Sequence, residues 1–197
     1  MSDSQTILVD CITLHHHYRG WLRLNGMRLS DQLSDKRTDS IELRDVQITA
    51  AGHKAPSLEC SQLTLLKERI LIAMPRDSQE RPSSQRLNKF QKKDRRGAIV
   101  VLPGHLLSGV MQLPKMAYSW SLLKEGGTLQ PFIGLTNVTV HNAVFRLTPQ
   151  SCSVAIVQRD AVEAIELTSA PLQAASSPEV LAQAEGDYAE SVDPAAR

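Results

Sequence analysis

The sequence predicts a mainly β protein made of two tandem small β-barrel units with short helices. Apolar residues occur in short runs between polar turns, a pattern typical of short strands. The residue order of positions 6–75 recurs, with few identities, in positions 97–168. A polar, basic stretch separates the two regions. Together these observations indicate a duplicated unit.

The chain divides into four parts where its composition changes. Residues 1–75 and 97–168 are predicted to be the first and second small β-barrel units. Residues 76–96 hold eight Lys or Arg and three Asp or Glu, and we expect them to be a linker. Residues 169–197 are rich in Ala, Ser and Pro and carry acidic groups, which predicts a disordered tail.

The first unit is expected to contain five strands. In the third, Ile41 and Leu43 share one phase of the alternation, whereas Val46 and Ile48 share the other, so a bulge or bend must lie between the two pairs. The polar turn Lys67–Arg69 separates the last two strands. The expected strands are Ile7–Leu14, Trp21–Leu24, Ile41–Thr49, Leu63–Leu66 and Ile70–Pro75.

Each unit also has a candidate short helix. In the first unit, Leu29 and Leu33 would share a helix face. In the second, Pro114 suits a helix start and Gly126 a helix end. Both candidates fall between the second and third strands of their unit, so each unit is predicted to have the order β–β–α–β–β–β.

The repeat has a defined register. Shifted by 89 residues, the first unit matches the second at Gly20 and Gly109, Leu24 and Leu113, and His16 and His105. An insertion then raises the shift to 92. At that shift the matched pairs are Ile41 and Ile133, Leu43 and Leu135, Asp45 and Asn137, Val46 and Val138, Ile48 and Val140, and Cys60 and Cys152.

These positions resemble the Sm-like small β-barrels, in which a strongly bent strand carries a glycine and a later strand carries the signature L-x-D/N-V-x-I. The segment Arg28–Leu33, "RLSDQL", is also similar to an uncharacterised bacterial family with an R-L-S-D-x-L segment. The resemblance implies bent strands and, in the family, an RNA pocket. That pocket's Asp-x-x-x-Asn and Arg-Gly are missing from both units, so the resemblance assigns no RNA-binding residue to this sequence. The residues that carry the resemblance are Gly20, Leu24, Leu43, Asp45, Val46 and Ile48, with their partners in the second unit.

No catalytic, cofactor-binding or metal-ligating residue emerges from the sequence. His15 and His17 would point the same way in a strand, but the second unit has no histidines at the corresponding positions. Protein zinc sites also need three or four protein ligands. Cys60 and Cys152 read as small buried hydrophobes. Asp31 and Asp35 would share a helix face, yet no acid–base pair recurs in the second unit. The odd number of cysteines, three, and the lack of C-x-x-C disfavour a disulfide framework.

The basic linker is the candidate polyanion-binding segment, although a solvated linker is the simpler explanation of its charge and attraction to the acidic tail is a further alternative. The whole chain has a net charge of +1 and 4% aromatic residues, so neither a global charge bias nor base stacking favours nucleic acid. The candidate contacts are Lys89, Lys92, Lys93, Arg95 and Arg96.

We therefore expect a non-enzymatic interaction or regulatory module whose partner is another protein. The alternatives are an Sm-like RNA-binding protein that uses the basic linker, and an enzyme whose site only the fold assembles. No leader or long apolar run is apparent, so we expect a cytoplasmic location and no membrane span. The oligomeric state does not follow from the sequence, and we expect no cofactor.

If the linker governs polyanion affinity, its substitution should abolish weak binding. We expect the variant with Ser at all five candidate contacts to lose affinity for a mixed single-stranded oligonucleotide. The wild-type log affinity should fall with log salt by about 0.7 for each phosphate neutralised. A salt titration of both proteins checks this, and an unchanged slope in the variant would contradict it.

Overall fold

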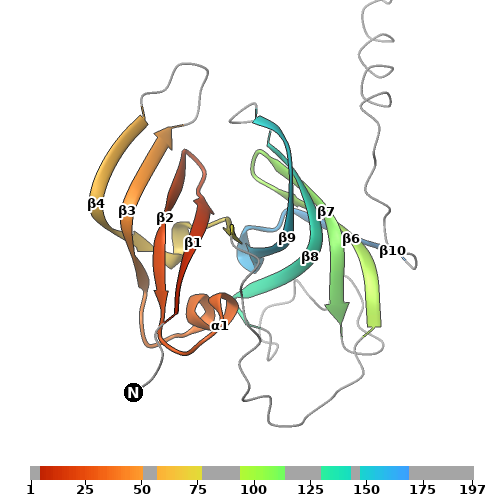
Figure 1. Ribbon diagram of the computed structural model, residues 1–197. Coiled ribbons are helices and arrows are strands. Elements are labelled where there is room, and N and C mark those ends of the chain that lie inside the picture. Colours follow the sequence, from red (N-terminus) through yellow and green to blue (C-terminus); the bar gives the residue numbers. More distant parts are fainter. Residues whose placement is uncertain (1–4, 51–56, 77–93, 114–129, 143–146, 169–197) are drawn as a thin grey trace, which may run out of the picture.

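The computed structural model describes residues 5–50, 57–76, 94–113, 130–142 and 147–168. They form one open, ten-stranded antiparallel sheet with one short helix and two 3₁₀ turns (Figure 1). The order across the sheet is β10-β6-β7-β8-β9-β5-β1-β2-β3-β4. The first-half elements are β1 (Gln5–Ile12), β2 (His16–Leu24), α1 (Leu29–Ser34), β3 (Ser40–Ala50), β4 (Ser57–Leu66), η1 (Lys67–Arg69) and β5 (Ile72–Pro75). The second-half elements are β6 (Asp94–Leu102), β7 (His105–Leu113), β8 (Phe132–Asn142), β9 (Leu147–Gln158), η2 (Arg159–Ala161) and β10 (Ala164–Thr168).

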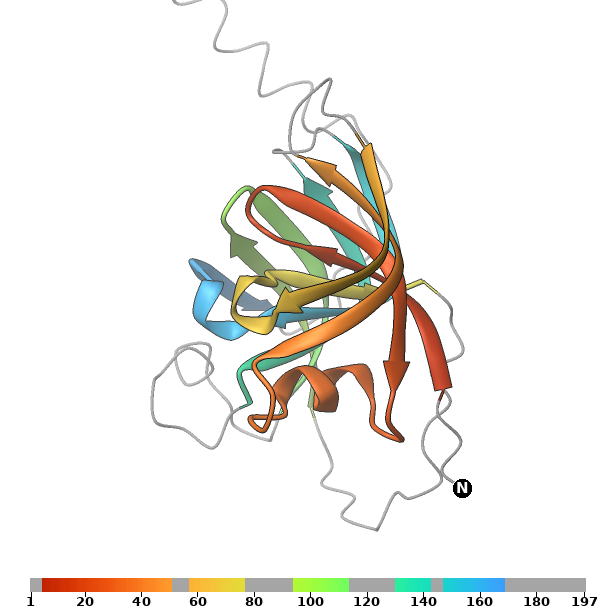
Figure 2. The same ribbon diagram turned by 90° about the vertical axis from the view of Figure 1, so that its left-hand side faces the viewer.

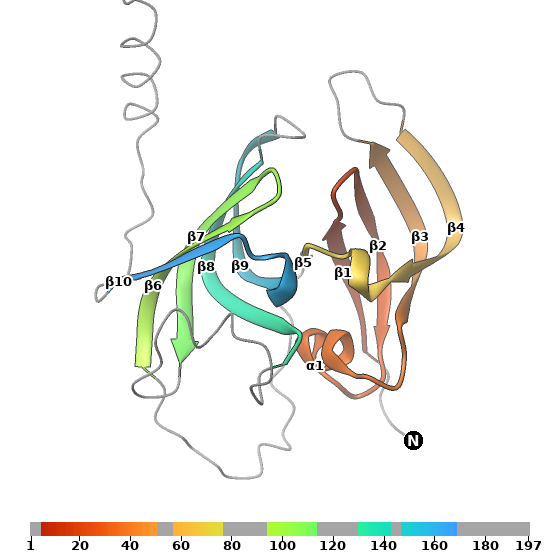
Figure 3. The ribbon, with the colours of Figure 1, turned by 180° about the vertical axis from the view of Figure 1, so that it is seen from behind.

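The mainly β class is confirmed, but the prediction of closed barrels is wrong. Strand β5 pairs with β1 on one side and with β9 on the other, so the two halves share one continuous sheet. Closure of the first half would require β5 to pair with β4, and β9 already occupies that edge of β5. Strands β4 and β10 are left as the two ends of the sheet, far apart in Figure 3.

The two halves have the same strand order. The first reads β5-β1-β2-β3-β4 and the second β10-β6-β7-β8-β9, so the strands correspond in chain order. The strand pairings also correspond: residues paired in the first half have counterparts paired in the second half at the sequence shifts of 89 and 92. Leu24 is paired with Gln5 at one end of β1, and Leu113 is paired with Asp94 at the same end of β6.

The bend expected in the third strand is a β-bulge opposite a glycine. Arg19 pairs with Gln47 and Trp21 with Arg44, so two residues of β3 face Gly20 alone. Asp45, in the bulge, has a φ of 48°. This left-handed conformation turns the strand over, which puts Leu43 and then Val46 on the buried side. Figure 2 shows the resulting curvature of the first half.

The second half contains the same device. The register between β7 and β8 shifts between Ser108 and Val110, at Gly109, and Asn137 has a φ of 53°. Asp and Asn tolerate this conformation better than other side chains because they can hydrogen-bond locally. The backbone conformation at the bulge therefore explains why the signature has Asp or Asn at this position.

The predicted helix in the first half is confirmed as α1, with Leu29 and Leu33 buried. It lies between the two halves, beyond one end of the strands, and contacts β8 (Figure 1). The turn at Lys67–Arg69 is the 3₁₀ turn η1. The second helix candidate, at 114–126, lies outside the described residues.

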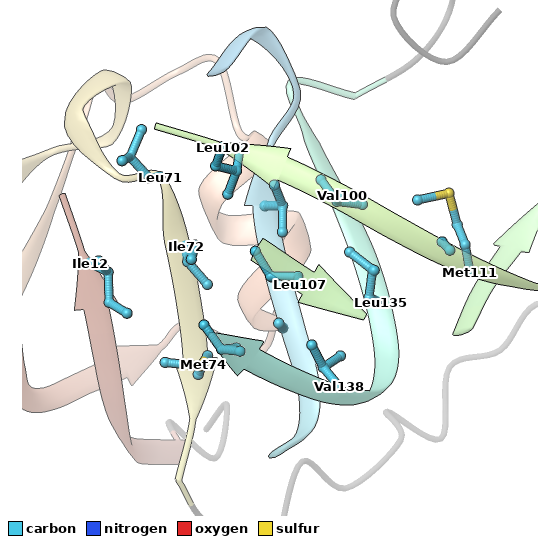
Figure 4. Close-up of a cluster of buried hydrophobic side chains, with 14 of the residues drawn as sticks. Ile12, Leu71, Ile72, Met74, Val100, Leu102, Leu107, Met111, Leu135 and Val138 are labelled. Atoms are coloured by element: carbon cyan, nitrogen blue, oxygen red, sulfur yellow. The ribbon is translucent and has the colours of Figure 1, made fainter. Parts of the chain in front are cut away.

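Strand β5 contributes to both hydrophobic cores. Ile72 and Met74 pack with second-half residues such as Leu107 and Val138 (Figure 4), whereas Ala73 packs into the first-half core. Successive strand residues point to opposite faces, so both faces of β5 are buried. This explains why the β5 segment reads as an unbroken apolar run.

The ends of the predicted linker belong to the fold. Arg76 bonds to first-half residues, and Arg95 and Arg96 lie in β6, paired with Gln112 and Met111. Residues 77–93, with Lys89, Lys92 and Lys93, lie outside the described residues, as does the tail 169–197. Replacing both arginines therefore alters a strand, and a variant of the three lysines alone is the cleaner test of polyanion binding.

Gly20→Ala should destabilise the protein. A Cβ at this position would lie 3.0 Å from the Arg44 carbonyl oxygen and 3.1 Å from Val46 Cγ2, so the bulge would have to shift. We expect a loss of roughly 1–3 kcal/mol in the free energy of unfolding, measured by chemical denaturation. Gly134→Ala is the control, because its Cβ would meet nothing within 4 Å. Equal losses in the two variants would contradict the steric explanation.

Candidate functional site

The three consecutive histidines do not form a site of their own. His15 lies in the turn between β1 and β2, so the expectation that it shares a strand face with His17 is wrong. His16 begins β2, and its ring centroid lies 5.8 Å from that of Tyr18. His17 Nε2 lies 3.2 Å from Asp10 Oδ1. In the described part of the chain, no group of three or more His, Cys, Asp or Glu could hold a metal.

His105, the counterpart of His16, is buried with both ring nitrogens in contact with polar atoms. Its Nδ1 lies 2.7 Å from the Pro103 carbonyl oxygen, and its Nε2 lies 3.0 Å from Asn142 Nδ2. A neutral ring that donates from Nδ1 and accepts at Nε2 satisfies both contacts. Burial lowers the pKa of His105, against the opposing effect of the Pro103 hydrogen bond. The ring is therefore placed to stabilise the β6–β7 turn rather than to move protons.

The cysteines are shielded rather than activated. Burial, reinforced by the charge of Asp10, raises the pKa of Cys11 to about 12. Burial also raises the pKa of Cys152 to about 11, although the Arg76 charge opposes the rise. Cys60 and Cys152 are partly buried and pack against the two cores, much as the sequence predicts. At neutral pH the Cys11 and Cys152 thiols stay protonated, and a protonated thiol is a poor nucleophile.

The aspartates singled out from the sequence act locally. Asp31 lies in the first turn of α1. Asp35 ends the helix and accepts three hydrogen bonds from the Arg37 guanidinium and one from the Arg37 amide. Lys67 donates from Nζ to the Asp35 carbonyl oxygen and to Thr38 Oγ1, each at 2.8 Å, and so ties the loop after α1 to η1. No acid–base pair results.

A buried carboxylate, which the sequence analysis did not single out, organises the junction between the halves. The Asp10 side chain is fully buried, and it accepts a hydrogen bond from Arg19 Nε at 2.8 Å. Arg76 Nε donates to its other oxygen, and His17 lies beside the first. Arg76 Nη2 also reaches Gln150 Oε1 on β9 at 3.4 Å. One carboxylate thus holds side chains from β2 and from the end of β5 against β9.

Electrostatics at Asp10 favour the ionised form. Burial alone would raise the pKa of this carboxyl, but hydrogen bonds from His17 and Arg19, together with their charges, outweigh it and hold the pKa far below its usual value. A cavity of about 170 Å³ lies beside the carboxylate, lined in part by Gln150 and Cys152. Because the carboxylate is already paired with cations, this group has little basicity to offer a substrate.

Only one signal in the sequence could have revealed Asp10. It is a charged residue inside the apolar run Ile7–Leu14, where alternation leaves it on the face opposite Val9 and Cys11. Its partner Arg76 is 66 residues away, in the segment read as a linker. A buried charge needs a partner, but the sequence does not say which of many arginines supplies it.

Strand β4 is an open edge with exposed apolar side chains. It is ten residues long, and among the described strands it pairs only with β3. Leu58 is 64% exposed and Leu66 is 46% exposed. At the corresponding positions of β9 stand Gln150, which contacts Arg76, and Gln158, whose side chain donates to the Glu68 carbonyl oxygen. The exposed leucines thus occupy positions at which β9 side chains hydrogen-bond to the other half.

The core of the first half is also incompletely covered along β4. Ile48 and Leu63 are only partly buried, whereas their counterparts Val140 and Ala155 are buried. The difference has a structural cause, because β5 lies alongside β9 and packs Met74 against that core. Nothing in the described part of the chain lies alongside β4 in this way. A further strand at β4 would bury these side chains.

Comparison with known proteins finds no matching family model, no similar curated protein and no similar solved structure. The resemblance to Sm-like barrels therefore stays a prediction. No helix in the described ranges is long and apolar enough to cross a membrane.

Asp10→Asn should weaken the fold at the junction. The variant leaves Arg19 and Arg76 without their carboxylate, and we expect a loss of roughly 2–4 kcal/mol at pH 7. Asp10 has a lowered pKa when folded, so its contribution is complete above the ordinary aspartate pKa of about 4 and is lost as the pH falls below it. The gap between wild type and variant should accordingly narrow in acid.

Chemical denaturation at pH 7 and pH 3 measures that gap. Arg44→Gln is the matched control, since it breaks an exposed pair with Glu42 whose N–O distance is 3.6 Å. A gap that widens at pH 3 would contradict the role assigned to the Asp10 carboxylate.

Proposed function

We propose that the chain is a non-enzymatic interaction module that binds a partner by adding a strand to the β4 edge. The single observation that carries this proposal is the uncovered apolar side of β4, where Leu58 is 64% exposed and Ile48 and Leu63 are only partly buried. An open edge offers unpaired backbone groups, and apolar side chains beside it add affinity and selectivity.

The opposite edge of the sheet supports the proposal by contrast. Strand β10 is five residues long, half the length of β4, and carries the exposed Glu166. Short, charged edges are a common protection against unwanted strand pairing. One end of the sheet is thus protected and the other is open, as expected if only β4 receives a partner.

The chemistry of the described side chains also favours binding over catalysis. The Asp10 carboxylate is paired with cations, His105 has contacts at both ring nitrogens, and the Cys11 and Cys152 thiols have raised pKa values. These four groups are therefore occupied or protonated at neutral pH, which disfavours their use as bases or nucleophiles.

We further propose that the two halves are copies of one Sm-like unit. The same strand order, the same bulge opposite Gly20 and Gly109, and the positive φ of Asp45 and Asn137 support a common origin. RNA binding through the basic segment stays the alternative function, tested by the salt titration.

A peptide that copies β5 tests whether the β4 edge accepts a strand. The peptide "RILIAMPR", residues 69–76, is the strand that β9 accepts in the other half. We expect it to bind the full chain with a dissociation constant in the micromolar range, because a single added strand buries little area. Isothermal titration calorimetry measures the binding.

Leu58→Arg should weaken the peptide at least tenfold, because Leu58 stands at the position of Gln150, which Arg76 contacts, so the peptide's Arg76 would meet a second cation. Leu106→Arg is the matched control, since Leu106 is 43% exposed but lies on β7, inside the sheet. A second control is the same peptide with Asp at the positions of Ile72 and Met74. Equal binding to the two variants would overturn the proposed edge.

A further inference from the structure

The junction inside the chain cannot simply be repeated between copies. There, Ile72 of β5 is paired with Val157 and Ala73 with Ile156 of β9, and Met74 packs into the second-half core. The counterpart of Met74 on β10 is Glu166, at a shift of 92 residues. Pairing of β10 with β4 of another copy would press this carboxylate against an apolar flank. Burial of an unpaired charge is unfavourable.

The apolar side of β4 is instead complementary to itself. Leu63 and Leu65 pair with Leu43 and Ile41, which are buried in the first-half core. Cys60 and Leu58 pair with Val46 and Ile48, which follow the bulge on the same side. Because cross-strand pairs share a face, these four β4 residues form one stripe.

The stripe is symmetric about the peptide bond between Ser61 and Gln62. Leu58 lies as far before this point as Leu65 lies after it, and Cys60 and Leu63 are likewise equidistant. The bulge at Asp45 creates this symmetry, since it moves the apolar side from odd to even positions along β3 and, correspondingly, from even to odd positions along the antiparallel β4. A two-fold axis at this point would superpose the stripe on itself.

We propose that β4 pairs antiparallel with β4 of a second copy, about a two-fold axis between Ser61 and Gln62. This rests on the proposed function and names its partner. Leu58 then lies opposite Leu65 of the second copy, and Cys60 opposite Leu63. On the other face Glu59 lies opposite Thr64 and Ser61 opposite Gln62, so no like charges meet. The pairing needs no rearrangement of the fold, because it uses the side chains and backbone groups that already lie along the β4 edge.

Such a dimer closes on itself. The same edge serves both copies, which leaves the two β10 strands as the only ends of a twenty-stranded sheet, and those ends carry Glu166. Pairing of β4 with β10 would instead leave one edge of each kind free and would continue to larger assemblies. The polarity of β10 thus fits a closed dimer.

Sedimentation equilibrium of the full chain over a range of concentrations tests the dimer. We expect a reversible monomer–dimer equilibrium with a dissociation constant in the micromolar range for the wild type. Leu58→Arg should be monomeric over the same range, with its dissociation constant raised at least tenfold. Leu106→Arg and Ala164→Arg, on β7 and β10, should dimerise like the wild type. Circular dichroism confirms that each variant is folded.

A mixture of Leu58→Arg and Ala164→Arg separates the two modes of assembly. Under the proposal, Ala164→Arg forms dimers by itself, whereas Leu58→Arg does not. If β4 pairs with β10, both variants are monomeric alone but combine into a dimer when mixed, and the proposal is wrong. Assemblies larger than a dimer in the wild type would also overturn it.

The register has its own test. Under oxidising conditions, a mixture of Glu59→Cys and Thr64→Cys chains should form a disulfide-linked dimer well above the background of the wild type, because these positions face each other. Neither variant alone should do so to the same extent. Cross-linking of Glu59→Cys with itself at the mixed level would contradict the register.

The peptide experiment keeps this inference distinct from the proposed function. If "RILIAMPR" binds at the Leu58 edge but the wild type is monomeric at all concentrations, the second copy is not the partner, although the edge still accepts a strand. If the chain dimerises, the peptide should compete with the dimer. Failure of both experiments would overturn both proposals.

Discussion

The structure depends on one shared strand. Strand β5 is four residues long, pairs with β1 and β9, and contributes Ile72 and Met74 to one core and Ala73 to the other. Neither core is complete without it. Each half therefore depends on the other, and the apolar run of β5 is required by burial on both faces.

The polar counterpart of this shared strand is Asp10. Its carboxylate joins Arg19 from β2 and Arg76 from the end of β5, and Arg76 reaches Gln150 on β9. Burial of a charge is costly unless cations surround it, so the cluster requires all these elements to be in place together. It makes the junction specific, whereas the hydrophobic contacts of β5 are less directional.

The asymmetry between the halves follows from the same junction. Strand β9 is covered by β5, and its core positions Ala155 and Val157 are buried. Strand β4 occupies the corresponding place, but none of the described strands lies on its outer side, which leaves Leu58 exposed and Leu63 partly so. Two halves with one strand order thus have different surfaces, and the difference lies at the edge to which we assign binding.

The sequence by itself determined the local features of the fold. Alternation of apolar residues indicated the strands, the change of phase between Leu43 and Val46 indicated the bulge, and Leu29 and Leu33 indicated α1. These features depend on residues close in the chain, whose spacing decides which side is buried. The repeat register of 89 and 92 residues also matches the observed ladders, because equivalent strands require apolar residues at equivalent positions.

Only the tertiary structure decided how the halves join and where a site can lie. Whether β5 closes its own half or pairs with β9 depends on contacts between residues 80 or more positions apart, which no local pattern records. The same holds for the pairing of Asp10 with Arg76 and for the openness of β4. A strand has the same alternation whether its edge is covered or free, so exposure of Leu58 could be learned only from the assembled sheet.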